Sequence, residues 1–230
     1  MLVVIRFRIG GSLRFLSHAE TIRVFQRACV RAGVQIAYSQ GFNPHQQMSL
    51  VPPRSVGVES DDDMLCLWLK EGQTAPVRKN CNTELSNKSQ ISKGAGIDVE
   101  SLKSALPAGI EIISAETSEA KNIPEPISAR YVMKVQGQKI DDGVKKHIAD
   151  VLASDKVVVS RRAGEDSRTK PVDVRPFLEA IQAEPEGFIV DCKISPAGTI
   201  RVDEILGLLQ LKTADLIGPV RRTNVQWKGI

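Results

Sequence analysis

The order of strand-like and helix-like segments restricts the fold of this 230-residue chain more than any other feature. In the first half, alternating apolar residues predict strands and a 3.6-residue period predicts helices. The expected strands cover residues 2–9, 63–69 and 109–116, and residues 34–38 and 46–51 are expected to be extended segments around a turn. The expected helices begin at His18 and at Asp98, where each is capped, and end near residues 32 and 105. This order is strand, helix, two strands, helix and strand, with an interruption between the extended segments at 34–38 and 46–51.

A similar order follows the proline-containing joint Asn122-Ile123-Pro124-Glu125-Pro126. Its strands are expected at 130–136, 156–161, 187–194 and 219–227, and its helices at 141–153 and 202–210. In addition, residues 171–182 could form a strand followed by a short helix. We therefore predict an α+β protein made of two tandem ferredoxin-like halves with antiparallel sheets, residues 1–120 and 121–230.

The helix after residue 17 has clear start and stop signals. Ser17 and Glu20 form a capping box, in which each side chain accepts a hydrogen bond from the other residue's backbone N–H. Gly33 suits the left-handed residue that ends a helix. Helical spacing predicts a buried face made of Ile22, Phe25, Cys29 and Ala32.

Residues 71–97 are rich in Gly, Ser, Asn, Lys and Gln and have no hydrophobic period. This composition predicts a flexible loop or insertion in the first half. The cysteines, Cys29, Cys66, Cys81 and Cys192, are scattered without a C-x-x-C pair, which favours buried, inert thiols.

No run of about 18 apolar residues occurs, so we expect no membrane partner. Arg6 and Arg8 interrupt the apolar N-terminal stretch, which is atypical of a signal peptide and predicts a cytoplasmic location. The P-loop, Rossmann, nucleophile-elbow and zincin motifs are absent from the sequence, which argues against the corresponding enzyme classes.

Positive charge is concentrated near the N-terminus. Residues 1–58 contain seven arginines and a single acid, Glu20, although the whole chain carries only +4. Arg23, Arg27 and Arg31 recur every four residues and therefore form a row on one face of the first helix. Such a row predicts an anionic partner, and a solvated basic face without a ligand is the alternative.

The segment from Tyr38 to His45 combines turn formers with aromatic and polar side chains. Gly41 and the Asn43-Pro44 pair explain a turn. Tyr38 or Phe42 could stack on an RNA base, and Gln40, Asn43 and His45 could hydrogen-bond it. A packed turn whose aromatic rings enter the core is the alternative.

His18 lies at a helix N-terminus, where anions are favoured, and Arg14 precedes it by four residues. His18 and His45 are the candidates for acid/base catalysis. We predict no metal site. In the second half, Arg161, Arg162, Lys170 and Arg175 could bind phosphates, or could instead form structural ion pairs in a charged hairpin.

Several long segments resemble, in order and spacing, the radical SAM-linked (radical SAM-associated) protein family. They are Arg14-Phe15-Leu16-Ser17-His18, the helix up to Arg31-Ala32-Gly33, Tyr38-Ser39-Gln40-Gly41-Phe42-Asn43-Pro44-His45, Val56-Gly57-Val58-Glu59-Ser60, Thr169-Lys170-Pro171-Val172-Asp173-Val174-Arg175-Pro176, Arg201-Val202-Asp203-Glu204-Ile205-Leu206 and Arg221-Arg222-Thr223. Two departures are the Gln46-Gln47 pair, where the family usually has Pro and a basic residue, and the polar insertion at 71–97.

The resemblance implies an accessory role, because family members occur beside, or fused to, cobalamin-binding radical SAM proteins and have no established activity. The chain lacks the C-x-x-x-C-x-x-C run that ligates an iron–sulfur cluster. We therefore expect no cofactor in this chain, and the iron–sulfur cluster, SAM and cobalamin only on the partner.

These observations together predict a non-catalytic module that binds RNA for a radical SAM partner in RNA modification or processing. Two alternatives stay open. One is a metal-independent ribonuclease or RNA-modifying enzyme that uses His18 or His45. The other is a protein–protein adaptor whose basic face docks on an acidic partner.

Overall fold

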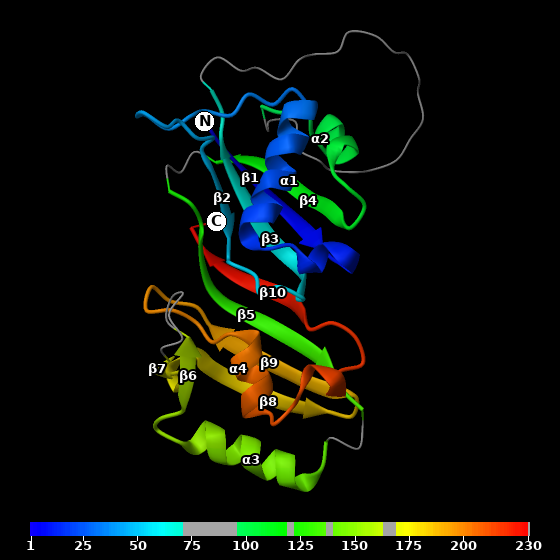
Figure 1. Cartoon of the computed structure of the whole chain (residues 1–230), viewed down its shortest axis with the longest axis vertical. Coiled ribbons are helices and arrows are strands. Elements are labelled where there is room, and N and C mark those ends of the chain that lie inside the picture. Colours follow the sequence, from blue (N-terminus) through cyan, green and yellow to red (C-terminus); the bar gives the residue numbers. More distant parts are fainter. Residues whose placement is uncertain (71–95, 119–121, 137–139, 163–168, 230) are drawn as a thin grey trace. The chain divides into compact units, whose positions relative to one another are not determined.

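A computed structural model describes residues 1–70, 96–118, 122–136, 140–162 and 169–229, which form two compact units (Figure 1). The first unit contains Met1–Val56 and Asp62–Ile123, and the second contains Gly57–Asp61 and Pro124–Lys228. Strand β3 (Glu59–Trp68) therefore gives its first three residues to the second unit and its other residues to the first. Most of the predicted insertion at 71–97 lies outside the described residues.

The first unit has the predicted order of strands and helices. It contains β1 (Leu2–Ile9), η1 (Gly11–Phe15), α1 (His18–Arg31), β2 (Met48–Val51), the greater part of β3, α2 (Val99–Ala105) and β4 (Ile110–Ser118). Strand β1 lies between β4 and β3, and β2 pairs antiparallel with β3 over residues 64–67. The apolar side chains of β1 pack on α1, where the Phe7 and Phe25 rings meet edge to face at 4.7 Å.

The capping signals of α1 are confirmed. Ser17 accepts a hydrogen bond from the Glu20 N–H, and the Glu20 carboxylate accepts one from the Ser17 N–H. Gly33 follows the helix with φ of +69°, which favours glycine. The fully buried face of α1 consists of Thr21, Phe25, Ala28 and Cys29, whereas the predicted Ile22 and Ala32 are only half-buried.

The second unit contains one more hairpin than the predicted order. Its elements are β5 (Glu125–Lys134), α3 (Asp142–Ala153), β6 (Val158–Arg162), β7 (Thr169–Asp173), η3 (Arg175–Phe177), β8 (Leu178–Glu184), β9 (Gly187–Lys193), α4 (Val202–Leu208), η4 (Thr213–Asp215) and β10 (Arg221–Lys228). The sheet order is β10-β5-β9-β8 with antiparallel pairs. Strand β10 also pairs in parallel with Glu59 and Ser60 of β3.

The second unit departs from the predicted order at the strand that precedes β9. The strand expected at 156–161 is present as β6, but it pairs with β7 in a separate two-stranded sheet. The strand and short helix considered within 171–182 end at Phe177 as β7 and η3, and residues 178–184 form the unpredicted strand β8, which pairs with β9. Leu178 and Ile181 are both buried, at a spacing of three that imitates a helix. A register shift between Leu178 and Ala180 turns both side chains toward the core.

The two units share one arrangement of strands. The order β4-β1-β3-β2 in the first unit corresponds, strand for strand along the chain, to β10-β5-β9-β8 in the second. Each unit also inserts a hairpin between its first helix and the following strand. The β6–β7 hairpin occupies this place in the second unit, and the first unit has the Tyr38–Gln46 bridge there.

Candidate functional site

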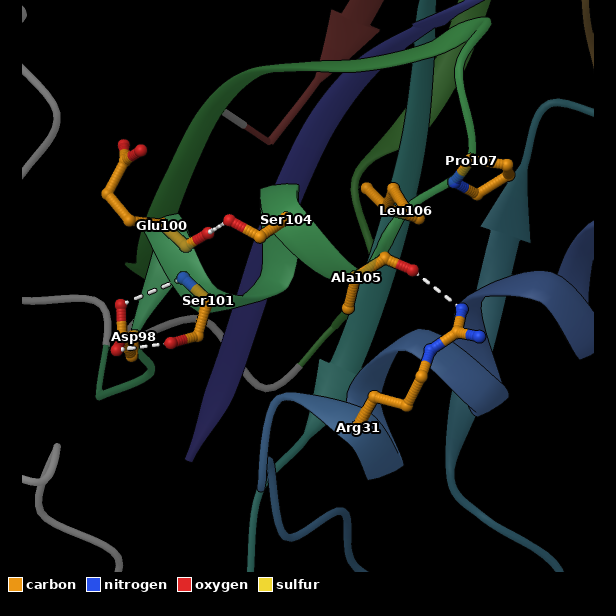
Figure 2. A pocket seen from close by; sticks show the side chains of 8 residues that line it. All are labelled: Arg31, Asp98, Glu100, Ser101, Ser104, Ala105, Leu106 and Pro107. Atoms are coloured by element: carbon orange, nitrogen blue, oxygen red, sulfur yellow. Dashed lines mark hydrogen bonds between the residues drawn. The ribbon is translucent and has the colours of Figure 1, made fainter.

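The predicted arginine row of α1 lies on the surface. Arg23, Arg27 and Arg31 are exposed, and none of them has a carboxylate within 4 Å among the residues that the structure describes. Arg31 donates a hydrogen bond to the Ala105 carbonyl at the end of α2, at 2.6 Å (Figure 2). This bond satisfies an otherwise open helix carbonyl and leaves the positive charge in place.

Arg31 also lines a hollow of about 950 Å³ beside α2. The polar groups drawn in Figure 2 are bonded within the protein: Ser101 donates to Asp98 at 2.6 Å, and Ser104 donates to the Glu100 carbonyl at 2.9 Å. Asp98 also caps α2 by accepting from the Ser101 N–H. The polar groups of this hollow therefore serve mainly to cap α2 and to connect it to α1.

The Tyr38–His45 segment forms a small hairpin closed by Ser39 and His45. The Ser39 N–H donates to the His45 carbonyl at 2.8 Å, and Ser39 Oγ lies 3.0 Å from His45 Nδ1. The Tyr38 side chain is exposed, and that of Phe42 is completely exposed. Hence neither ring enters the core, unlike the packed turn that the sequence left open. Gln40 and Asn43 are exposed on the same hairpin.

A second hollow, of about 1010 Å³, lies beside this hairpin. Tyr38 and Gln46 line it from the base of the hairpin, Val30 from the end of α1, and Trp68 and Lys70 from the end of β3. Gln46 Nε2 donates to the Tyr38 hydroxyl at 3.4 Å. Sequence reasoning missed this hollow because its walls come from segments nearly forty residues apart.

At the end of α1, Arg31 of the arginine row and the Tyr38–His45 hairpin lie on different faces of the helix. Arg31 lines the hollow beside α2, whereas its neighbour Val30 lines the hollow beside the hairpin. Successive residues of a helix point about 100° apart. The two hollows therefore lie on different faces of the end of α1.

The two candidate catalytic histidines lie at opposite ends of α1. His18 is the first residue of this 14-residue helix, which is about 20 Å long, and the His45 hairpin follows its other end (Figure 1). Both imidazoles are exposed. They therefore do not form one acid/base pair in this structure.

Carboxylates far along the chain neutralise part of the N-terminal charge. Arg6 binds Asp62, Arg54 lies 3.6 Å from the Asp63 carboxylate, and Arg8 lies 3.4 Å from that of Glu111. Arg14 has a different environment, because it lies over the Phe15 ring at 4.3 Å and donates to the Gly11 carbonyl. Among the described arginines of the first unit, Arg14, Arg23, Arg27 and Arg31 thus have no carboxylate within 4 Å.

The second-unit arginines are held by protein groups. Arg161 makes two hydrogen bonds to the Glu204 carboxylate, at 2.7 and 2.8 Å, and one to the Thr199 carbonyl. Arg175 donates to the carbonyls of Leu152, Ser154 and Leu178. Lys170 is exposed on β7, and the side chain of Arg162 lies outside the described residues.

Burial makes the thiols poor ligands and nucleophiles. It raises the pKa of Cys29 and of Cys192 to about 12 and that of Cys66 to about 11, the charges of Asp191 and Glu179 adding to the effect at Cys192. Cys81 lies outside the described residues. Among the residues in the described ranges, no three His, Cys, Asp or Glu side chains are grouped to hold a metal ion. No helix in these ranges is long and apolar enough to cross a membrane.

The fold and the site define an α+β protein of two similar units, with an exposed aromatic hairpin and a row of open arginines on the first. A family model described as an uncharacterized protein conserved in bacteria (DUF2344) matches residues 3–101 and 97–207. The chain therefore belongs to this DUF2344 family. A comparison with curated proteins found no match.

Proposed function

We propose that this protein is a non-catalytic accessory module that binds single-stranded RNA with its first unit and presents it to a radical SAM partner. The observation that carries the proposal is the exposure of Tyr38 and Phe42 on a closed hairpin, near a helix whose arginines keep open charges. Exposed rings stack on bases, and arginines attract the phosphates between them.

The contact surface in this proposal follows the end of α1. Arg23 and Arg27 attract the backbone, Arg31 lies where the backbone crosses the helix, and the hairpin meets the bases. Arg14 extends the positive surface toward η1. Arg161 and Arg175 play no part, because their guanidinium groups hold Glu204 and backbone carbonyls. Lys170 remains a second, weaker candidate contact.

The proposal of a radical SAM partner rests on the resemblance of the sequence segments to the radical SAM-linked family. The iron–sulfur cluster, SAM and cobalamin belong to that partner in this proposal. In the same proposal each unit is ferredoxin-like, a reading supported by the shared strand order and the antiparallel pairing of the two units. The location proposed for such an RNA-processing pair is the cytoplasm.

The separation of His18 and His45 argues against one site that uses both imidazoles, because both would have to reach the same phosphate. The ribonuclease alternative is thereby narrowed to an enzyme that uses one of the two histidines. The adaptor alternative differs in its partner, because the basic face would then hold a protein in the absence of RNA.

The proposal is tested with the double variant Arg23→Ala/Arg27→Ala. A control variant, Lys145→Ala/Lys146→Ala, removes the same charge from exposed positions of α3. Each phosphate contact contributes about 0.7 to the slope of log affinity against log salt for single strands. We expect the arginine variant to lose about 1.4 from this slope, and the control to keep the wild-type slope. Equal slopes in the two variants, or no RNA binding by the wild-type protein at low salt, would contradict the proposal.

A further inference from the structure

Exposed apolar side chains gather around the hollow beside the hairpin. Met1, Val30 and Tyr38 line it, and they are 51%, 67% and 56% exposed. The completely exposed Phe42 belongs to the adjoining hairpin. Exposed apolar side chains that cluster around one hollow often mark a binding site, whereas scattered single ones are ordinary. The bond from Gln46 Nε2 to the Tyr38 hydroxyl in this lining is long, at 3.4 Å, whereas Ser101 and Asp98 in the hollow beside α2 are joined at 2.6 Å.

Two aromatic rings and several amides line the same hollow. Tyr38 and Trp68 supply the rings, and Gln35, Gln46 and Gln47 supply the amides. The backbone near Trp68 is fixed on both sides, because its carbonyl accepts from the Ala37 N–H at 2.6 Å and its N–H donates to the Gln47 carbonyl at 3.1 Å. The walls are therefore held by strand-like hydrogen bonds and are formed before a ligand arrives.

A ligand that matches this lining is flat, has two apolar faces and carries donors and acceptors along its edge. A nucleobase has these properties, since its faces stack on aromatic rings and its edge accepts and donates hydrogen bonds. The base must be unpaired, because a base within a duplex presents neither face. The volume of about 1010 Å³ lies at the upper end of the usual range for small-ligand sites, which leaves room for the attached sugar.

One positive charge belongs to the hollow itself, because Lys70 is part of its lining. A phosphate next to a base in the hollow would therefore lie near Lys70, whereas Arg31, which lines the hollow beside α2, is left for a more distant phosphate of the same strand.

We propose that the hollow lined by Tyr38, Trp68 and Val30 holds one unpaired base of a single-stranded RNA. This inference rests on the proposed function and names the part of the RNA that the first unit recognises. Because a side-chain amide carries both a donor and an acceptor, this lining can meet the edge of more than one kind of base.

The test compares an oligoadenylate of about eight nucleotides, a length within the usual site size, with a chain of the same length that lacks all bases. Both probes carry the same phosphates. The proteins are the wild type, Tyr38→Ala, Tyr38→Phe and the control Ile113→Ala, which removes an exposed apolar side chain from β4. Affinity is measured by fluorescence anisotropy of labelled probes. Quenching of Trp68 fluorescence in a Trp227→Phe background gives a second measurement.

We expect Tyr38→Ala to weaken oligoadenylate binding about tenfold or more, as loss of one stacked base does. The affinities of Tyr38→Phe and Ile113→Ala are expected to stay within about twofold of the wild type, because both variants keep an aromatic ring at position 38. The abasic chain is expected to bind the wild type and Tyr38→Ala equally, and only oligoadenylate is expected to quench Trp68.

The inference fails alone if oligoadenylate binds with the expected salt dependence but Tyr38→Ala binds it as tightly as the wild type does. It also fails if Tyr38→Ala loses a co-purifying protein while keeping full RNA affinity, because the hollow would then hold a protein. Absence of all RNA binding at low salt overturns the proposed function itself. Free adenosine monophosphate that binds as tightly as the oligomer would show a nucleotide site in place of an RNA site and would likewise overturn the inference.

Discussion

The Arg6 guanidinium on β1 donates two hydrogen bonds to the buried Asp62 carboxylate on β3, from Nε at 2.9 Å and from Nη2 at 2.7 Å. These residues are 56 positions apart in the sequence, and both belong to the first unit. The pair places a charge from the basic N-terminal segment against a carboxylate of the acidic run that begins β3. Arg6 is one of the seven arginines that make residues 1–58 basic, but here its charge is bound within the fold.

The first prediction concerns this pair. Arg6→Ala leaves the buried Asp62 carboxylate without two of its charge-assisted bonds, so we expect a loss of about 2 kcal/mol in the free energy of unfolding. The control is Arg8→Ala, since Arg8 forms an exposed pair with Glu111 and contributes at most about 1 kcal/mol. Urea denaturation measures both. Equal losses for the two variants would show that the Arg6–Asp62 bonds are not special.

The second prediction concerns Glu204 and pH. Burial raises the pKa of Glu204, but the hydrogen bonds from Arg161 and from the Arg201 N–H, together with their charges, outweigh this effect and lower its pKa overall. A carboxyl whose pKa is lowered by folding stabilises the protein above its unfolded pKa, and this stability is lost as the pH falls through the folded pKa.

Glu204→Gln is therefore expected to cost about 2 kcal/mol at pH 7. It is also expected to flatten the loss of stability below about pH 4.5, the ordinary pKa of a glutamate, because the unfolded wild-type chain takes up the Glu204 proton there before the folded protein does. Thermal melts between pH 7 and pH 3 measure the difference. Parallel pH profiles for the wild type and the variant would contradict this assignment of the pKa.

The third prediction concerns the space around Gly187, which begins β9. A Cβ at this position would overlap the Met133 carbonyl oxygen on β5, so Gly187→Ala must push two paired strands apart. We expect a cost of about 1–3 kcal/mol, as for other overpacked sites. Gly207→Ala in α4 is the matched control, because no atom lies within 4 Å of its added Cβ. This control gains up to about 1 kcal/mol from helix propensity. A Gly187→Ala protein as stable as the control would refute the close approach.

The fourth prediction concerns the thiols of Cys29, Cys66 and Cys192. Their raised pKa values keep them protonated at pH 8, and burial excludes reagents. Iodoacetamide is expected to modify these three residues only after denaturation, as read by peptide mass spectrometry. Modification of any of the three in the folded protein within minutes would indicate local opening.

Local signals in the sequence predicted where α1 and α2 begin. Ser17 and Asp98 each cap a helix by accepting a hydrogen bond from an N–H three residues later, and such contacts need no tertiary structure. The exposure of Phe42 was left open, because the same turn residues fit a ring that is packed or exposed.

Features that depend on tertiary pairing were not predictable. The sequence pattern at Leu178 and Ile181 imitates a helix, and only the pairing of β8 with β9 reveals the register shift. The charge of residues 1–58 looked uniform along the sequence, but its partners Asp62, Asp63 and Glu111 lie beyond that segment. The hollow beside the hairpin joins Val30 to Trp68, which a single sequence does not place together.

Ultraviolet crosslinking of the full chain to single-stranded RNA, with the crosslinked peptides mapped by mass spectrometry, tests the central claim most directly. We predict crosslinks on the Tyr38–His45 hairpin and at Trp68, which disappear when salt is raised enough to release the phosphates. Crosslinks confined to the second unit, or none at low salt, would contradict the claim that the first unit binds RNA.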